Sequence, residues 1–464
     1  MFDKILIANR GEIAVRIIRA CREMGIKTVA VFSEPDREAL HAQLADEAVC
    51  IGSAKAADSY NNMNNIISAA VLTKAQAIHP GFGFLSENST FAAMCKECNI
   101  KFIGPDPEVI DLLGNKANAR TMMQNAQVPV IPGSDGVVKD IDRAYEIAEK
   151  LGYPVMVKAS AGGGGKGIRI VRRKEDLAKA FESAKSETKA AFGDDALYME
   201  KVIEHARHIE VQILGDDYGN VIHLGERDCS LQRKNQKVLE EAPSPAVPQS
   251  VREELCAAAV RAAKAAGYQS AGTIEFLYDR SKQFYFMEMN TRVQVEHPVT
   301  EMITGVDIIK EQIRIADGKR LSIAQYRPSL GKLGSAGRQR ITISGHAIEC
   351  RINAENPDKN FAPCPGAIEY LLLPAGGLGL RVDTAVYEGY EIPPYYDSMI
   401  AKVIVHGRDR KEAIAKMKRA LYEFIIKGID TNIAFQEKIL NHEEYIAGDF
   451  DTTFLEEKVI DRKD

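Results

Sequence analysis

One short stretch of the chain carries side chains suited to hold a metal ion and an anion. Residues 284–298 read FYFMEMNTRVQVEHP, in which polar and apolar residues alternate. In an extended chain alternate residues share a face, so one face would hold two acids, two amides and a guanidinium. These are Glu288, Asn290, Arg292, Gln294 and Glu296. The opposite face is apolar enough for a core, with Thr291 as its polar exception.

A third acid is expected to join them through a β-hairpin. Strand-like residues 273–278 precede a turn at 279–282, which would bring Glu275 roughly opposite Glu288. Two carboxylates and the amide oxygen of Asn290 are hard ligands that suit Mg²⁺, with Mn²⁺ as an alternative, beside substrate phosphates. A solvated salt-bridging face is the other interpretation, but this face has no lysine and its acids lie in an apolar hairpin. We therefore predict a metal site of these three residues.

A glycine-rich loop supplies a second chemical signal. Residues 157–168 read VKASAGGGGKGI, with five glycines between two predicted strands. Gly163, Gly164 and Gly165 would let backbone N–H groups approach phosphate oxygens, and Lys158 at the end of the first strand could reach the same phosphates. The loop is not a Walker A motif, since no Gly-Lys-Ser/Thr opens a helix. A flexible surface hairpin would need neither the lysines nor the apolar strand, so phosphate binding is favoured.

Other polar residues carry little information by themselves. The string QRKNQK at 232–237 has the composition of a solvated loop, and single residues such as Lys116 and His208 are more often structural. The one Cys-x-x-Cys pair, Cys95 and Cys98, has no second pair at zinc spacing and falls on a helical pattern. We assign it no metal or redox role.

These residues need a scaffold, and the first hundred residues predict a parallel sheet wound by helices. Short apolar strands alternate there with helical stretches, without hairpin signals. The predicted strands are 4–8, 28–32, 48–51, 75–79 and 101–103. Glu34 and Asp36 follow the second strand, where an acid would bind a dinucleotide ribose, but the first turn has only Gly11 where three glycines are required. A dehydrogenase is therefore disfavoured.

The rest of the chain predicts a small unit followed by antiparallel structure. Residues 106–126 are helical, 128–133 form a linker, and 326–340 are expected to be an exposed loop. The other predicted elements are helix 141–151, strands 155–159 and 168–171, helix 174–189, strand 197–202, hairpins 209–224 and 273–289, and helix 411–426. Glycine and polar turns between short strands indicate hairpins rather than crossovers.

Composition narrows the class of protein. The 464 residues include 60 basic and 65 acidic side chains, a net charge of −5, and 45% hydrophobic residues. This length suggests about three domains. The net negative charge does not indicate a nucleic-acid-binding protein. No apolar run approaches the roughly 18 residues of a membrane span, and the N-terminus lacks a signal-peptide pattern. We expect a cytoplasmic protein that binds neither nucleic acid nor membrane.

Together these motifs resemble the biotin carboxylase subunit of biotin-dependent carboxylases, of the acetyl-CoA or pyruvate carboxylase type, in the ATP-grasp superfamily. The matching stretches follow the family's order along nearly the whole chain. They are IANRGEIA at 7–14, HPGFGFLSEN at 79–88, GNK at 114–116, the glycine loop, EEAPSP at 240–245, residues 287–300, ECRINAE at 349–355 and YYDSM at 395–399.

The resemblance implies an α/β fold that becomes α+β in its C-terminal part. An N-terminal doubly wound parallel sheet (1–113) would lead through a linking helix and linker (114–135) to a small ATP-grasp lid (136–203). The ATP-grasp body and an antiparallel-sheet C-terminal domain would occupy 204–464. Closure of the lid would exclude water from a labile intermediate.

The resemblance also implies roles for individual residues. ATP would contact Lys116, Lys158, Gly163, Gly164, Gly165, Glu200, Lys201, His208, Gln232, Asn235, Glu275 and Glu288. Bicarbonate would be bound by Lys237, Arg292, Gln294 and the backbone of Val295. Glu296 would be the general base, and Arg351 would steady the biotin ureido oxygen as an enolate. Asn235 stands where some relatives have a histidine, so we expect altered nucleotide affinity.

The implied reaction carboxylates biotin with bicarbonate through carboxyphosphate, releasing ADP and phosphate. Biotinylated domains carry Met-Lys-Met, whereas the nearest string here, KMK at 416–418, has the inverse order. Biotin is therefore expected on a separate carrier protein, with a separate carboxyltransferase subunit that chooses the acceptor. The family also implies a homodimer. Two rivals stay open: another ATP-grasp ligase that makes an acyl-phosphate, and a non-catalytic nucleotide-binding subunit, which would not need Glu296 or Arg351.

Overall fold

The computed structural model describes residues 1–159, 168–192, 195–324 and 339–460. The glycine loop, with Gly163, Gly164 and Gly165, lies outside the described residues, as does most of the 326–340 stretch. Within the described part, no helix combines the length and apolarity that a membrane crossing requires.

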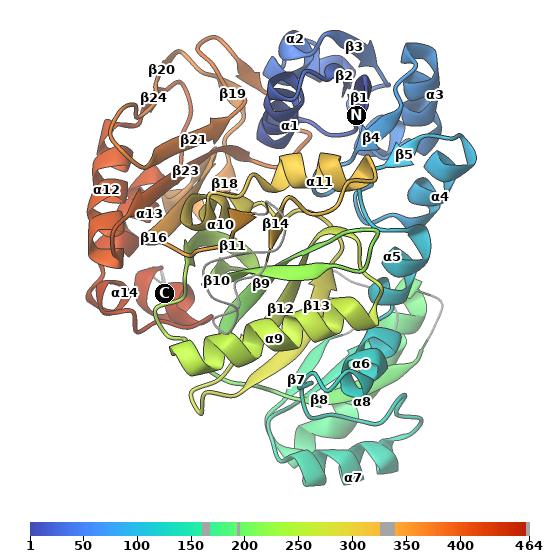
Figure 1. Ribbon diagram of the computed structural model, residues 1–464. Coiled ribbons are helices and arrows are strands. Elements are labelled where there is room, and N and C mark those ends of the chain that lie inside the picture. The colour runs from blue at the N-terminus through green and yellow to red at the C-terminus, as the bar shows by residue number, and fades with distance from the viewer. Residues whose placement is uncertain (160–167, 193–194, 325–338, 461–464) are drawn as a thin grey trace.

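The N-terminal unit is a parallel five-stranded sheet, as predicted, and its strands lie in the order β3-β2-β1-β4-β5. Its strands are β1 (Lys4–Ile7), β2 (Lys27–Phe32), β3 (Glu47–Cys50), β4 (Ala77–His79) and β5 (Lys101–Phe102). Helices α1 (Gly11–Glu23), α2 (Leu40–Leu44), α3 (Met63–Thr73) and α4 (Ser89–Glu97) connect them (Figure 1). Along β1, Ile5 and Ile7 pack with α1, whereas Leu6 packs with α3 and α4. The sheet is therefore covered on both faces.

The helix predicted over 106–126 is in fact two helices. They are α5 (Pro107–Gly114) and α6 (Lys116–Asn125), separated by Asn115, whose backbone is extended (φ −86°, ψ 105°). The Asn115 side chain accepts a hydrogen bond from the N–H of Asn118 at 3.0 Å, which is the geometry of a helix N-cap. This local bond competes with continuation of α5, so α6 starts as a separate helix at Lys116.

A small unit with its own core follows. Strands β6 (Val155–Ala159), β7 (Arg169–Val171) and β8 (Leu197–Lys201) form an antiparallel sheet that packs on α7 (Ile141–Leu151) and α8 (Leu177–Phe192). The strands and α7 agree with the sequence predictions, while α8 begins after a single 3₁₀ turn at Lys174–Asp176. The unit lies apart from the N-terminal sheet, at the bottom of Figure 1.

One eight-stranded sheet, in the order β13-β12-β9-β10-β11-β16-β23-β21, forms the body and continues into the C-terminal part. All its neighbours are antiparallel, as predicted. The strands are β9 (Arg207–Gly215), β10 (Val221–Arg233), β11 (Gln236–Ala242), β12 (Ser270–Tyr278), β13 (Phe284–Asn290), β16 (His346–Asn353), β21 (Leu380–Thr384) and β23 (Met399–Gly407).

Helices cover the two faces of this sheet differently. Helix α9 (Gln249–Ala265) packs on the apolar face of β9 and β12, and α12 (Arg410–Glu423) packs on β16 and β23. Helices α10 (His297–Thr304) and α11 (Ile308–Ala316) lie toward the N-terminal unit, on the opposite face (Figure 1). The polar site is enclosed on that second face.

The C-terminal part is completed by short elements. The helix predicted over 411–426 ends at Glu423, because Ile425–Lys427 forms strand β24, which pairs with β20 (Tyr370–Leu372). The others are β14 (Ile323–Ala324), β15 (Gln339–Arg340), β17 (Glu355–Asn356), β18 (Ala362–Pro363), β19 (Gly366–Ala367), β22 (Glu391–Ile392), α13 (Ile433–Asn441) and α14 (Glu443–Ala447).

Candidate active site

A row of polar side chains lies on the second face of the eight-stranded sheet. Strand β9 alternates Ile209, Val211 and Ile213 toward α9 with Glu210 and Gln212 toward the site. Strand β12 matches this register, with Glu275 beside Glu210 and Thr273 beside Gln212. From β10, the buried Arg227 donates to Glu210 at 2.5 Å and to Gln212 at 2.8 Å. The sheet therefore fixes a buried polar cluster rather than a solvated surface.

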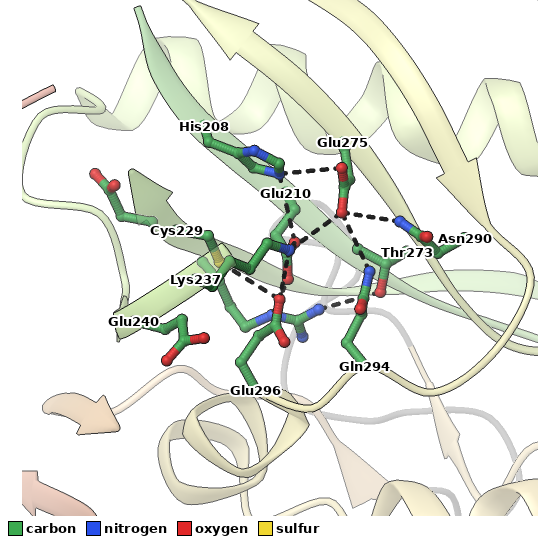
Figure 2. A network of polar contacts seen from close by, with 12 residues as sticks. His208, Glu210, Cys229, Lys237, Glu240, Thr273, Glu275, Asn290, Gln294 and Glu296 are labelled. Atoms are coloured by element: carbon green, nitrogen blue, oxygen red, sulfur yellow. Dashed lines mark hydrogen bonds and ion pairs between the residues drawn. The ribbon is translucent and has the colours of Figure 1, made fainter. Parts of the chain in front are cut away.

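Lys237 is the centre of this cluster (Figure 2). Its Nζ lies 2.6 Å from Glu210, 3.1 Å from Glu275 and 2.6 Å from Glu296. Burial alone would lower the pKa of Lys237, but these three carboxylates outweigh it and raise the pKa well above its ordinary value. The three carboxylates therefore favour the charged form of the ammonium, which lies between them.

Glu296 is held between two cations. Its Oε1 accepts from Lys237, and its Oε2 accepts from Arg351 Nη2 at 2.9 Å. Burial would raise the pKa of this carboxyl group, but Lys237 and Arg351 outweigh it and hold the pKa well below the ordinary value. The two cations therefore favour the ionised form of Glu296.

Arg351 projects from β16 and is shared by two acids. Its Nε donates to Glu240 Oε1 at 2.6 Å, while Nη2 also reaches Glu296. Burial raises the pKa of Glu240 to about 7, although Arg351 opposes the shift. One guanidinium thus links the proposed base to a second buried carboxyl group on β11.

Beyond Asn290 the prediction of an extended chain is wrong. Strand β13 ends at Asn290, and residues 291–296 turn into α10, whose first turn contains Pro298. Proline is favoured at a helix start and lacks the N–H that a continuing strand would require. Side chains still converge, because Asn290 Nδ2 and Gln294 Nε2 both donate to Glu275 Oε1, at 2.8 and 3.2 Å.

Arg292 leaves the sheet and joins the N-terminal unit. Its Nε donates to Glu87 Oε2 at 2.8 Å, and Glu87 Oε1 accepts from the backbone of Thr291 at 3.0 Å. A second nitrogen, Nη1, donates to Gln294 Oε1 at 2.8 Å. The guanidinium therefore spans the N-terminal unit and the body, with Gln294 beside it.

The predicted pairing of Glu275 with Glu288 is confirmed by the register of β12 and β13. Burial and the nearby charge of Glu275 raise the pKa of Glu288, and Lys116 lies 3.7 Å from this carboxylate. The pKa of Glu275 is lowered, because Lys237 and His208 outweigh its burial. A half-exposed carboxylate beside a buried one is a donor set that fits a divalent cation, with Asn290 adjacent.

A pocket of about 230 Å³ lies next to this acid pair, between the small unit and the body. Lys116, Lys158, Glu200 and Glu288 line it, together with apolar residues that include Ile131 and Phe286. Lys158 Nζ lies 2.5 Å from Glu200 Oε2. An apolar slot with cations at its rim suits a nucleotide base and its phosphates.

Other predicted nucleotide residues are arranged around the cluster or away from it. His208 contacts Glu275 at 3.2 Å and Gln232 at 3.0 Å, whereas Lys201 donates to the carbonyls of Gly152 and Tyr153. Asn235 is exposed in a two-residue turn between β10 and β11, with φ +63°. The 232–237 string is therefore a hairpin that places Lys237, rather than a loose loop.

Comparisons with known proteins agree across the chain. The family model for the biotin carboxylase N-terminal domain matches residues 1–110, and that for the biotin carboxylase C-terminal domain matches 349–457. Between them, the ATP-binding domain of the carbamoyl-phosphate synthase L chain matches 115–324. Biotin carboxylase 1 of Bacillus subtilis (strain 168) is 57% identical over 457 residues, covering 98% of each chain. The chain belongs to the biotin carboxylase family.

Solved biotin carboxylase structures share the whole fold. A Campylobacter jejuni biotin carboxylase in complex with a β,γ-ATP ligand has a TM-score of 0.91 and 48% identity, covering 98% of this chain and 99% of that one. The biotin carboxylase domain dimer of Hydrogenobacter thermophilus 2-oxoglutarate carboxylase, in complex with MgADP, ADP and bicarbonate, has a TM-score of 0.90 and 51% identity, with 100% of both chains covered. The predicted ATP-grasp fold is confirmed.

Several residues of this biotin carboxylase site escaped the sequence analysis. Glu210 contacts Lys237, Glu87 contacts Arg292, and Arg227 contacts Glu210, yet none of the three belongs to the motif around 288–296. The alternation His208-Ile209-Glu210-Val211-Gln212 was a usable signal for Glu210, since a buried strand rarely keeps polar residues on one face without partners.

Proposed function

We propose that this chain carboxylates biotin with bicarbonate at the expense of ATP, through carboxyphosphate, and releases ADP and phosphate. One observation carries the proposal: Glu296 is a buried carboxylate between an ammonium and a guanidinium, beside the acid pair Glu275 and Glu288. A base held next to anion-binding cations and a nucleotide pocket suits deprotonation of a small anion that then attacks a phosphate.

The proposed bicarbonate site consists of Lys237, Arg292, Gln294 and the backbone of Val295. Bicarbonate is a small planar anion, and a guanidinium fork with an ammonium matches its oxygens. Because Lys237 now contacts Glu296 and two other acids, bicarbonate would take over part of its hydrogen bonding. Glu296 would then lose cationic stabilisation, and its pKa would rise toward the range of a useful base.

The proposed reaction has two stages, the formation of carboxyphosphate and the carboxylation of biotin. Glu296 takes the bicarbonate proton, and a bicarbonate oxygen attacks the γ-phosphate of ATP, which expels ADP and gives carboxyphosphate. Carboxyphosphate breaks into CO₂ and phosphate, and the phosphate takes the ureido proton of biotin. The ureido nitrogen then captures CO₂ while Arg351 stabilises the oxygen that carries the developing charge.

Glu275 and Glu288, with Asn290 adjacent, would hold Mg²⁺ or Mn²⁺, and a bound ion supplies charge neutralisation for the ATP phosphates. We expect excess EDTA to abolish ATP hydrolysis and added Mg²⁺ to restore it. Glu288→Gln removes one ligand charge, so the Mg²⁺ concentration for half-maximal activity should rise at least about tenfold. A metal titration of ATP hydrolysis measures this, and an unchanged midpoint in the variant would remove Glu288 from the metal site.

Arg351→Ala is expected to remove the stimulation of ATP hydrolysis by biotin, with a loss of about 10²–10³-fold in biotin-dependent turnover. Arg410→Ala is a matched control. Arg410 lies 2.7 Å from Glu241, a buried acid that follows Glu240, the partner of Arg351, on strand β11. Turnover at saturating ATP and bicarbonate, with and without free biotin, measures the effect. Equal biotin stimulation in both variants would contradict the assignment.

The partners are proposed from family membership. The chain would carboxylate biotin that is attached to a separate carrier protein, and a carboxyltransferase subunit would then use the carboxylated biotin. The chain would also form a homodimer. The acyl acceptor would be chosen by the carboxyltransferase. The cytoplasmic location expected from the sequence stays a prediction.

The decisive assay follows ADP release by the purified chain with ATP, Mg²⁺, bicarbonate and free biotin. Hydrolysis should depend on bicarbonate and rise when biotin is added. Another ATP-grasp ligase would hydrolyse ATP without responding to biotin, and a non-catalytic subunit would bind ATP without hydrolysis. Either result would overturn the proposal.

A further inference from the structure

A second buried lysine, Lys402, lies behind the proposed bicarbonate site. It projects from β23, where it pairs with Arg351 of β16 on one side and Asp383 of β21 on the other. Its neighbours Ala401 and Val403 belong to the core under α12, so Lys402 points to the opposite face, toward the site. The side chain is fully buried.

Lys402 joins three parts of the chain that are distant in sequence. Its Nζ donates to the backbone carbonyl of Val295 at 2.8 Å and lies 3.0 Å from Glu12 Oε1, at the start of α1. Burial would lower its pKa, but the charges of Glu12 and Asp383 oppose burial, and the pKa is raised. A charged donor therefore ties the C-terminal strands and the N-terminal unit to the 291–296 turn.

The bonded carbonyl belongs to the peptide that joins Val295 to Glu296. The preceding peptide is held separately, because His297 Nδ1 lies 2.8 Å from the Gln294 carbonyl. Fixing two successive peptide planes determines the direction of the Val295 N–H and of the Glu296 side chain. Residues 291–296 lie outside regular structure, so no strand or helix ladder would otherwise fix the second plane.

We propose that Lys402 is a positioning residue for the bicarbonate step, which holds the peptide between Val295 and Glu296 in the orientation that binding and deprotonation require. The inference rests on the proposed function. Lys402 touches no substrate in this scheme; it acts through the backbone of the turn. A misplacement of about 1 Å at a reacting group can cost about 10²-fold in rate.

The expected result is a selective loss. In Lys402→Met, the KM for bicarbonate should rise at least about tenfold and kcat should fall, whereas the KM for ATP should stay within about twofold. A lysine that only supported the fold would change both KM values together or neither. Steady-state ADP release, with bicarbonate and ATP varied in turn, separates these outcomes.

One further variant removes the effect of an unpaired buried charge. Lys402→Met leaves Glu12 without its cation, so Lys402→Met/Glu12→Gln neutralises that acid and should recover thermal stability. We expect the raised bicarbonate KM to persist in the double variant, because the Val295 carbonyl still lacks its donor. Recovery of the bicarbonate KM together with stability would overturn the proposal.

Arg252→Met is the matched control. Arg252 also links a buried acid to a backbone carbonyl, contacting Glu226 at 2.6 Å and Ser244 O at 3.2 Å, but it lies on α9 and away from the 291–296 turn. It should lose stability without a change in the bicarbonate KM. A wild-type chain without bicarbonate-dependent hydrolysis would refute the proposed function, whereas an active wild type with an unchanged bicarbonate KM in Lys402→Met would refute only this inference.

Discussion

Glu296→Gln is expected to lower the kcat of bicarbonate-dependent ATP hydrolysis by about 10²–10⁴-fold, the range that a general base contributes. Glutamine keeps the shape of the side chain and an oxygen for Lys237 or Arg351, but it cannot take the bicarbonate proton. Nucleotide affinity should change little, because the contacts of Glu296 are with Lys237, Arg351 and Cys229 rather than with residues lining the 230 Å³ pocket.

Glu349→Gln provides the matched control for this substitution. Glu349 is also a fully buried acid on β16, and burial raises its pKa well above the ordinary value, so glutamine replaces a side chain that is already neutral. Its kcat should stay near that of the wild type. Hydrolysis in Glu296→Gln at the rate of Glu349→Gln would show that Glu296 is not the base.

Lys237→Met is expected to destabilise the protein by about 3–5 kcal/mol and to abolish turnover. The substitution leaves Glu210, Glu275 and Glu296 facing one another without their shared cation, and buried charges that lose a partner carry a penalty of this size. Denaturant unfolding measures the stability. Lys174→Met is the contrast: Lys174 lies 2.5 Å from Glu149, but both side chains are exposed, so this substitution should change the stability far less than Lys237→Met does.

The destabilisation by Lys237→Met should depend on pH. In the wild type the pKa values of Glu275 and Glu296 are lowered, so their contribution to stability is present above the ordinary value of 4.5 and is lost as the pH falls. The variant lacks much of this contribution. The difference in unfolding free energy between the two proteins should therefore be larger at about pH 6 than at about pH 3. A difference that grows in acid would contradict the charge assignment.

Features that depend on local periodicity could be predicted from the sequence. The parallel N-terminal sheet followed from strands separated by helices, and the facing of Glu275 and Glu288 followed from a short turn between two alternating strands. Glu275 and Glu288 are close in sequence, and the sheet prediction needed only the alternation of short strands and helices along the chain. The family motifs added the individual roles, which alternation alone does not supply.

Features that depend on distant partners could not be predicted. Arg292 is aligned by Glu87, and Val295 is held by Lys402, over separations of 205 and 107 residues. No local pattern indicates such pairs. The break at Asn115 and the end of α12 before Ile425 were also missed, because a side-chain cap and a pairing with β20 override helical propensity there.

The unbroken eight-stranded sheet has a consequence for how the molecule unfolds. Strands β11 and β16 are hydrogen-bonded neighbours, so the strand of Lys237 and the strand of Arg351 belong to one ladder. Such a ladder melts cooperatively, whereas the three-stranded unit with its separate core can open by itself. Unfolding of the C-terminal strands would therefore also abolish ATP hydrolysis. Local unfolding of the small unit would leave the eight-stranded sheet folded.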